Sequence, residues 1–562
     1  MVHQRVLGAT HRGSNEFHQL VYLVRQYLAD LGSARALTVD LLLRSYIEGD
    51  LAALTEIVNL RCDPLNYCDS SSFKRDYAAT EVIRKFRAFP DSELDPEGTA
   101  LRGFFDSEAL CSRTNRRIRS GATSSLLDQN LDRAARFIKW VLGDVRDLTS
   151  EIWRQGAWGK GVTSSCKGKW LTEFHKMDAS PDCTLSFLHL APALWREATM
   201  GLDHREMCVV QGSKVTFVPK NAKTHRSIAI EPSVNLFAQR AVGKHMARRI
   251  RLKTGMDLTS QTRNQDLARR GSIDGSLATL DLSAASDTIS MGIVERLFPS
   301  EWIALMDACR SKFTEVDGKQ HLFHKWSSMG NGYTFEMETL IFTSLVRAVI
   351  SDSDWYSDNW AVYGDDIIVP CSSSEELCEL LEYCGFRLNM EKSFVSGPFR
   401  ESCGADFYDG VSVRPFYLKD FTDVSLETWA NRLYSDGLKC RKTWDLIIWK
   451  LGPSYPRIPV ELGMGGIFTE GVLPLSWMSP VVIRRGLVGR LCRVREWIAD
   501  SVDSKRVDGA AAVVANLRTL LARGPWEDRR QLIIDADSAL SEPWRLTARK
   551  SGKWVTKIRL VV

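Results

Sequence analysis

The sequence predicts an α+β protein built from several subdomains, and three observations support that prediction. First, 562 residues are more than one simple hydrophobic core organises, so we expect two to four subdomains. Second, short runs of β-branched and aromatic residues between turn residues predict hairpins within residues 214–232, 360–370 and 399–418. Third, apolar residues at helical spacing predict helices within residues 1–60 and over residues 335–350.

Composition narrows the class of protein. A hydrophobic fraction of 44% and a charged fraction of 25% are typical of soluble globular proteins. The 13 cysteines form no Cys-x-x-Cys pair, so neither a zinc site nor a complete disulfide framework is expected. The longest apolar runs are interrupted by charges, as at Arg347, and the chain starts without an apolar signal segment. We therefore expect a reduced, cytoplasmic protein without a membrane span.

Positive charge is concentrated toward the C-terminus. The net charge is +5, and residues 481–562 hold 17 Lys and Arg against 9 Asp and Glu. A basic segment suits contact with polyanions, and a solvated basic face explains it equally well. We expect basic helices from residue 479 onward. A second cluster, which contains Arg113, Arg116 and Arg117, is either an RNA contact or a solvated loop.

The first informative motif is a basic hairpin. Two strands are predicted by Lys214-Val-Thr-Phe-Val-Pro-Lys220 and Ser227-Ile-Ala-Ile-Glu-Pro232, and the hairpin end carries Lys220, Lys223 and Arg226. Like charges so close repel one another unless an anion neutralises them. A triphosphate is such an anion, which Arg grips bidentately and Lys attracts as a point charge. An exposed basic turn is the alternative.

A carboxylate is expected where a buried strand ends. Residues 277–282 predict a strand that ends near Asp281, a place where ligand sites form. The small residues Ser283-Ala-Ala-Ser286 then turn the chain, and Asp287 is expected to begin a helix that continues through Leu297. Asp287 either caps that helix or contacts a substrate.

A polar loop precedes the helix predicted over residues 335–350. Ser327-Ser-Met-Gly-Asn-Gly-Tyr-Thr334 supplies glycines for close backbone approach and polar donors at a helix N-terminus. Ser328, Gly330 and Asn331 are therefore candidates for contact with a bound nucleotide. An isolated Gly-Asn-Gly would be only a turn.

The chain is organised around Trp360-Ala-Val-Tyr-Gly-Asp-Asp-Ile-Ile-Val-Pro370. Its apolar flanks predict two buried strands joined by a tight turn, with Asp365 and Asp366 at the tip. Buried carboxylates are costly without a partner, so basic side chains or a divalent metal ion are expected beside them. For this stretch alone, an ordinary surface hairpin is the alternative. Lys392 lies near the predicted start of a further strand.

The strand before Asp281 and the hairpin with Asp365 and Asp366 would form one site if they are neighbours in one sheet. Asp281, Asp365 and Asp366 would then converge, and three carboxylates without a cation raise one another's pKa. Two Mg²⁺ ions, about 3.5–4 Å apart in such sites, would remove that repulsion. Oxygen-only ligands suit Mg²⁺ rather than zinc. The expected reaction is an in-line displacement at phosphorus, in which one ion activates a terminal 3′ hydroxyl and the other stabilises the departing pyrophosphate. Lys392 is then a candidate proton donor to the leaving group.

The motifs of one known family occur in the same order. Motifs A to D of right-hand RNA-dependent RNA polymerases are similar to Asp281-Leu-Ser-Ala-Ala-Ser-Asp287, Ser328-Met-Gly-Asn-Gly332, Tyr363-Gly-Asp-Asp366 and Lys392-Ser-Phe394. The family's motif F resembles Val218-Pro-Lys-Asn-Ala-Lys-Thr-His-Arg226. Motif E, as it occurs in the replicase catalytic subunit of RNA bacteriophages of the Qβ kind, resembles Phe399-Arg-Glu-Ser-Cys-Gly404.

That resemblance implies a right-hand fold, Mg²⁺ and replication of a positive-strand phage genome. It implies an N-terminal region and fingers over residues 1–213, fingers with the nucleotide-channel motif over 214–266, a catalytic palm over 267–420, and a thumb with a basic C-terminal region over 421–562. The nucleotide contacts expected from these motifs are Lys220, Lys223, Arg226, Ser286, Asp287, Ser328, Gly330 and Asn331. Relatives assemble with host elongation factors Tu and Ts and with a ribosomal small-subunit protein. Such partners, an RNA template and product, NTPs and a place in the host bacterial cytoplasm are therefore expected.

Two rival classes make different predictions. A reverse transcriptase generally places a bulky side chain against the 2′ position of the sugar, whereas residues 283–286 are all small and leave room for a 2′ hydroxyl. We therefore expect ribonucleotide substrates. A non-enzymatic RNA-binding protein would account for the basic residues but would leave Asp281, Asp365 and Asp366 without a purpose.

Overall fold

Helices and β-sheets are both extensive in the computed structural model. It describes residues 13–469, with gaps at 91, 122, 146–148, 160, 169–170, 172, 200–202, 204, 438, 459 and 461–464, and three strands within residues 480–561. Residues 500–551 lie outside the described part. Among the described helices, none is both long and apolar enough to span a bilayer.

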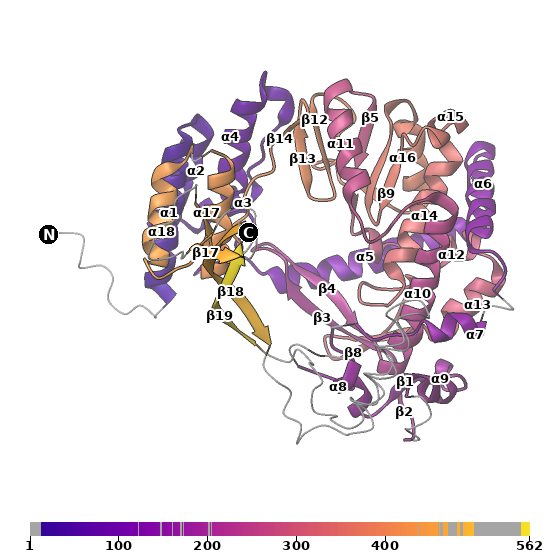
Figure 1. The fold of residues 1–562 in the computed structure, drawn as a ribbon. Coiled ribbons are helices and arrows are strands. Elements are labelled where there is room, and N and C mark those ends of the chain that lie inside the picture. Colours follow the sequence, from indigo (N-terminus) through magenta and orange to yellow (C-terminus); the bar gives the residue numbers. More distant parts are fainter. Residues whose placement is uncertain are drawn as a thin grey trace.

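Helices from the start of the chain pack against helices from near its other end (Figure 1). This terminal body, as we name it, contains α1 (Gly13–Leu31), α2 (Ala34–Ile47), α3 (Leu51–Asn59), α4 (Ser70–Glu81), α17 (Asp423–Ser435) and α18 (Arg441–Leu451). Its core includes Leu28, Ile57 and Ile447. Tyr27 meets Trp429 edge to face, with ring centroids 5.2 Å apart. The helices predicted within residues 1–60 are therefore confirmed, and distant residues complete their core.

A three-stranded antiparallel sheet organises the second body. Its strand order is β5 (Leu277–Leu280), β10 (Asp366–Pro370) and β9 (Ala361–Tyr363). Ile367 and Val369 belong to the core on one face, whereas Ile368 packs with α11 (Thr262–Asp274) on the other. The helices that share the larger core are α6 (Ser125–Leu142), α10 (Ser233–Thr254), α12 (Met291–Leu297), α13 (Ser300–Cys309), α14 (Thr334–Val349) and α16 (Ser374–Tyr383). The predicted hairpin, the strand before Asp281 and the long helix are confirmed.

A four-stranded sheet carries the predicted basic hairpin. Its strands, in spatial order, are β4 (His225–Ile230), β3 (Ser213–Pro219), β7 (Phe313–Val316) and β8 (Lys319–Leu322). The long helix α5 (Pro96–Ser120) packs on it through Phe104, which shares a small core with Val215, Val316 and Phe323. In Figure 1, α5 runs between the terminal body and the helices around α12.

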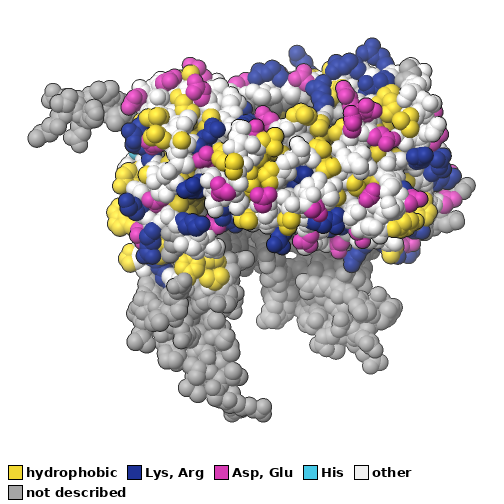
Figure 2. Space-filling model, turned by 90° about the horizontal axis from the view of Figure 1, so that it is seen from above, with side chains coloured by type: hydrophobic (Ala, Val, Ile, Leu, Met, Phe, Trp, Pro, Cys, Tyr) yellow, Lys and Arg dark blue, Asp and Glu magenta, His cyan; other side chains and the backbone are white. Residues whose placement is uncertain are grey.

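The remaining elements are short. They are α7 (Thr149–Arg154), α8 (Glu173–Asp178), α9 (Ala191–Ala198), α15 (Asp352–Tyr356), β1 (Asp182–Thr184), β2 (Cys208–Val210), β6 (Leu282–Ser283), β11 (Arg387–Leu388), β12 (Phe399–Ser402), β13 (Ala405–Tyr408), β14 (Val411–Ser412), β15 (Arg457–Ile458) and β16 (Ile467–Phe468). Four aromatic rings, Phe73, Tyr77, Phe399 and Tyr408, tie α4 to β12 and β13. Antiparallel pairing of β12 with β13 and of β13 with β14 confirms a hairpin within residues 399–418, although the strand predicted up to Leu418 ends at Ser412. Figure 2 shows Lys and Arg interspersed with Asp and Glu over the face seen from above.

Three sequence expectations about local structure are wrong. The arginines at 113–119 belong to α5 rather than to a loop, because apolar residues such as Phe104 and Cys111 recur on one buried side of that helix. Asp287 ends a 3₁₀ turn (Ala285–Asp287), and the following helix is capped by Ser290 instead. The expected helices after residue 479 are replaced, where the structure describes the chain, by strands β17 (Pro480–Ile483), β18 (Leu487–Ala499) and β19 (Gly552–Val561).

We predict that Trp429→Ala destabilises the terminal body by about 3–5 kcal/mol, because the indole is fully buried between the two ends of the chain. Chemical denaturation followed by tryptophan fluorescence measures the change. The matched control is Trp449→Ala on α18, whose side chain is 80% exposed, and there we expect a change within about 0.5 kcal/mol. Equal effects of the two substitutions would contradict the packing described.

Candidate active site

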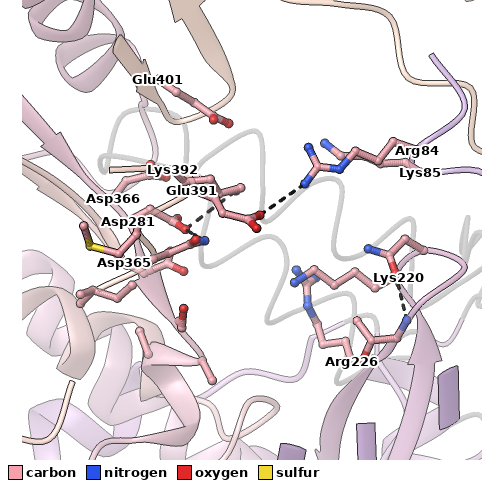
Figure 3. Close-up of a pocket in the computed structure, with 18 of the residues that line it drawn as sticks. Arg84, Lys85, Lys220, Arg226, Asp281, Asp365, Asp366, Glu391, Lys392 and Glu401 are labelled. Atoms are coloured by element: carbon pink, nitrogen blue, oxygen red, sulfur yellow. Dashed lines mark hydrogen bonds and ion pairs between the residues drawn. The ribbon is translucent and has the colours of Figure 1, made fainter. Parts of the chain in front are cut away.

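A cleft of about 900 Å³ lies between the three-stranded sheet, the basic hairpin and the terminal body. Its lining residues come from distant parts of the chain, within 61–64, 73–107, 220–227, 281–287, 365–366 and 389–401, together with Met329 and Tyr417. Carboxylates gather on one side of it and cations on the other, as Figure 3 shows. The cleft therefore has the charge separation that an anionic substrate held beside cations would need.

Strand pairing brings the acidic side together. β5 and β10 are antiparallel, with Leu280 opposite Ile367, so one further step along each strand sets Asp366 beside Asp281. Asp365 lies in the turn between β9 and β10. Gly364 starts that turn with φ +58°, and a Cβ there would lie 2.9 Å from the ring of Phe335. The turn that presents the two aspartates therefore requires glycine.

Asp281 and Asp366 lie in an environment that disfavours negative charge. Burial raises the pKa of Asp281 to about 6, with Lys392 opposing the shift and Asp365 adding to it. Burial also raises the pKa of Asp366, and Asp365 again contributes to the rise. These shifts are those expected where carboxylates accumulate without enough counter-charge.

Neighbouring polar groups hold Asp281 in place. Asn389 donates from Nδ2 to Asp281 Oδ2 over 2.6 Å, and Lys392 Nζ lies 3.9 Å from the same oxygen. Ser393 Oγ accepts from the backbone N–H of Asp281 over 3.1 Å. Burial disfavours charge on Lys392, but Glu401 and Asp281 outweigh it and raise the pKa of that lysine. Lys392 sits in a turn two residues before Phe394, which forms an isolated β-bridge with Thr279, and it lies beside the carboxylates as a cation.

The acidic residues do not form a complete metal site by themselves. Within the described residues, no three His, Cys, Asp or Glu side chains are grouped closely enough to hold a metal ion. Asp281 is directed toward Asn389, and Asp366 accepts a hydrogen bond of 3.4 Å from Ser402. Asp281, Asp365 and Asp366 thus line one cleft. Asp281 is hydrogen-bonded to Asn389, and Asp366 to Ser402.

Two of the three predicted cations of the basic hairpin line the cleft. Lys220 and Arg226 do so, whereas Lys223 is not among the lining residues and donates a hydrogen bond to Asn59 of α3. Partial withdrawal from water and the nearby Arg226 lower the pKa of Lys220. Burial and Arg61 lower the pKa of Lys223. Lys220 is therefore repelled by Arg226, whereas the cations that repel Lys223 are Arg61 and Arg84. Binding of a triphosphate by these residues stays a prediction.

Comparison with known proteins gives these observations a family. The model of the family described as RNA replicase, beta-chain, matches residues 37–434, which contain every motif described above. The chain belongs to the RNA replicase beta-chain family. It is 33% identical over 451 residues to the RNA-directed RNA polymerase subunit beta of Qbeta virus strain MX1, covering 77% of this chain and 75% of that protein.

Other members of the RNA replicase family match over shorter stretches. The subunit beta of Escherichia virus Qbeta is 39% identical over 353 residues, 62% of this chain and 59% of that protein. The beta chain of Escherichia phage MS2 is 44% identical over 245 residues, 43% of this chain and 45% of that protein. Among solved structures, the RNA-dependent RNA polymerase of a human picorbirnavirus overlaps 42% of this chain and 57% of that chain at 13% identity, with a TM-score of 0.31. We draw nothing further from so partial an overlap.

The glycine-rich loop of this replicase-family chain reaches the cleft through Met329. Met329 lines the cleft, whereas Ser328 and Asn331 are buried at 4% and 7% exposure. Met329 accepts a hydrogen bond from the backbone N–H of Ala229 over 2.8 Å, and Gly330 packs so closely on β4 that a Cβ would clash with Ala229 O. Nucleotide contact by Ser328, Gly330 or Asn331 stays a prediction.

The residues after Asp281 do line the cleft. Ser283, Ala284, Ala285, Ser286 and Asp287 all reach it. Ser286 donates to Glu338 of α14 over 2.6 Å. The arginines at 113, 116 and 117 are not among the lining residues, and Arg117 donates instead to the backbone of Glu382 over 3.2 Å. Their assignment to RNA binding also stays a prediction.

Sequence reasoning missed part of the charged lining. Arg61, Arg84 and Lys85 reach the cleft from the terminal body, and Glu391 and Glu401 reach it beyond Asp366. Arg84 and Lys85 point toward the carboxylates in Figure 3. No local pattern marks Arg84 and Lys85, because their place beside the cleft follows from the packing of α4 on β12 and β13. Only the packing of the terminal body could have shown them.

Glu338 gives a pH-dependent test of this environment. Burial raises the pKa of Glu338 from its ordinary value of 4.5 to about 8, and the hydrogen bond from Ser286 partly opposes the rise. The folded state therefore keeps a proton that the unfolded state releases between pH 4.5 and 8, so the wild type loses stability as the pH rises through that range. We expect Glu338→Gln to match the wild type near pH 4.5 and to exceed its free energy of unfolding increasingly toward pH 8.

Urea denaturation at several pH values measures the difference between the two proteins. Glu301→Gln, at an exposed position on α13, serves as the control. A difference between Glu338→Gln and wild type that stays constant with pH would show that Glu338 is ionised in the folded protein.

Proposed function

We propose that this chain is an RNA-directed RNA polymerase that replicates a positive-strand phage genome from NTPs. One observation carries the proposal: Asp281, Asp365 and Asp366, brought together by the pairing of β5 with β10, face Lys220, Arg226, Arg84 and Lys85 across a single cleft. Membership in the RNA replicase family supports the same activity. A protein that only bound RNA would have no use for buried carboxylates opposite cations.

The chemistry of the donor set suits two Mg²⁺ ions. Asp281, Asp365 and Asp366 offer only carboxylate oxygens, which Mg²⁺ prefers to the nitrogen and sulfur ligands typical of zinc. Burial, together with the neighbouring carboxylate of Asp365, raises the pKa of Asp281 and Asp366, and a bound cation would offset both causes. When bound, such ions activate the 3′ hydroxyl and stabilise the charge that develops on the pyrophosphate.

The chain's own residues hold and orient the substrates. Lys220 and Arg226 neutralise the triphosphate from one wall, and Arg84 and Lys85 do so from the terminal body. Lys392 is kept protonated by Glu401 and Asp281, and so carries a proton to give to the leaving pyrophosphate. The small residues Ser283 to Ser286 leave space for a ribose, which supports NTPs over dNTPs as substrates.

The larger organisation proposed is that of a right hand. Fingers come from residues 1–213 and 214–266, the palm from 267–420 and the thumb from 421–562. Because α1–α4 share a core with α17 and α18, the first helices would pack against the proposed thumb. RNA template and product are the macromolecular substrates. The matched relatives are named as beta subunits, which supports an assembly with host proteins, and we propose elongation factors Tu and Ts and a ribosomal small-subunit protein in the bacterial cytoplasm.

Asp365→Asn tests the proposal most simply. We expect template-directed NTP incorporation to fall roughly a hundredfold or more, since the substitution removes charge where the reacting groups gather. RNA binding, measured by filter retention at fixed salt, should persist because the cations are untouched. Asp257→Asn, in a loop after α10, is the matched control and should leave both properties unchanged. Full synthesis by Asp365→Asn would end the proposal.

The hairpin lysines give a second, paired test. Lys220→Met removes a cation that lines the cleft, and we expect the KM for NTPs to rise about tenfold, the scale of one lost hydrogen bond to a charged group. Lys223→Met, three residues away, removes a cation that contacts Asn59 instead and should change the KM far less. Steady-state kinetics with each NTP measures both. A larger effect at Lys223 would place the triphosphate outside this cleft.

A further inference from the structure

An ion pair that the proposed reaction does not use lies behind the cleft. Lys325 has a fully buried side chain, and its Nζ lies 2.8 Å from Oδ1 of Asp287. The rings of Phe104 and Phe323 surround it, with their centroids 4.3 Å and 5.3 Å from Nζ. A buried ammonium group costs several kcal/mol unless it is paired. We therefore expect Lys325 to keep its ion pair with Asp287.

The pair is supported from its far side. Glu108 of α5 approaches Lys325 Nζ to 3.9 Å through Oε1. Its other oxygen, Oε2, accepts from the backbone N–H of His324 over 2.7 Å and lies 2.9 Å from Nε2 of His321. Lys325 thus stands between two carboxylates whose positions are set by α5 and by the chain around β8. It cannot turn to another partner without leaving a charge unpaired.

Asp287 is fixed on both of its oxygens and still reaches the cleft. Oδ1 meets Lys325, and Oδ2 accepts from Ser227 Oγ of β4 over 3.1 Å. The side chain of Asp287 remains 14% exposed and lines the cleft, whereas Lys325 is not among the lining residues. Asp287 directly follows the small residues that leave room for a ribose. A carboxylate held in this orientation is a ready acceptor for one hydroxyl donor.

We propose that Lys325 is a positioning residue that fixes Asp287 as the acceptor for the 2′ hydroxyl of the incoming nucleotide, and thereby sets the preference for NTPs over dNTPs. The inference rests on the proposed function, because it needs a nucleotide in the cleft. Lys325 acts only through Asp287 and touches no substrate itself. Without Lys325, the Asp287 carboxylate would turn toward water, and the acceptor would be lost.

The expected effect is on selectivity rather than on synthesis as such. A hydrogen bond to a charged group is worth enough to change affinity about tenfold or more. In Lys325→Met we therefore expect the ratio of kcat/KM for CTP to that for dCTP to fall about tenfold, mainly because the KM for CTP rises. The parameters for dCTP should change little. If Lys325 had a purely structural role, its substitution would lower kcat/KM for CTP and for dCTP by the same factor and would leave their ratio unchanged.

The experiment uses the full chain with whatever subunits co-purify, a primed RNA template and single-nucleotide incorporation. Lys325→Arg keeps the charge and should restore most of the ratio. Lys214→Met is the matched control. It removes an exposed lysine of β3, in the four-stranded sheet that also contains Ser227, and this lysine pairs with Glu315 over 2.6 Å. It should leave the ratio at the wild-type value. Thermal melting establishes that each variant is folded.

A double-mutant comparison isolates the coupling to Asp287. In an Asp287→Ala background, Lys325→Met should lower the ratio no further, since the group that it positions is already absent. If Lys325→Met yields no folded protein, Lys325→Gln decides, because it keeps a hydrogen-bond donor without the charge, and a reduced ratio is again expected.

A folded Lys325→Met or Lys325→Gln with the wild-type ratio would overturn the inference, as would a further fall in the Asp287→Ala background. Failure of the proposed function is distinguishable from both outcomes. In that case the wild-type protein would incorporate no CTP under template direction, whatever the variants did.

Discussion

The pairing of β5 with β10 is the constraint on which the site depends. It joins Asp281 to Asp365 and Asp366 across 84 residues of sequence, and it buries the strands on which these carboxylates are carried. Burial raises the pKa of Asp281 and Asp366, so the fold itself creates a demand for positive charge at this point. Lys392 meets part of that demand, and a bound divalent cation would meet the rest.

The opposite wall of the cleft carries positive side chains, which come from other parts of the chain. Lys220 and Arg226 come from a hairpin in the four-stranded sheet, whereas Arg84 and Lys85 come from the terminal body. That body holds its position because its first helices share a core with α17 and α18. The cleft is therefore completed only when α1–α4 have packed with α17 and α18. A substitution that destabilises the terminal body would then also displace cations from the cleft.

Much of the three-stranded sheet could be predicted because its signals are local. The Gly364 turn and its apolar flanks specified the hairpin, and the strand before Asp281 ends as expected. The sequence could not specify contacts made by folding at a distance, such as Arg84 beside the cleft or Lys325 behind Asp287. It also misplaced a helix where tertiary burial decides: the arginines near 117 sit on α5 rather than in a loop, because the other side of that helix packs on β3 and β4. The burial of Ser328 and Asn331 beside Gly330, which packs closely on β4, was likewise not indicated by any local pattern.

Diffraction from crystals soaked in Mn²⁺ with a nonhydrolysable NTP tests the central claim most directly, because the anomalous signal locates the metal independently of the refined protein. The account predicts metal peaks within about 2–2.5 Å of carboxylate oxygens from both Asp281 and the Asp365–Asp366 turn, with the triphosphate bridging toward Lys220 and Arg226. Asp281 would then have exchanged its contact with Asn389 for the ion. Peaks confined to other residues, with Asp281 still bound to Asn389 while the nucleotide is present, would contradict it.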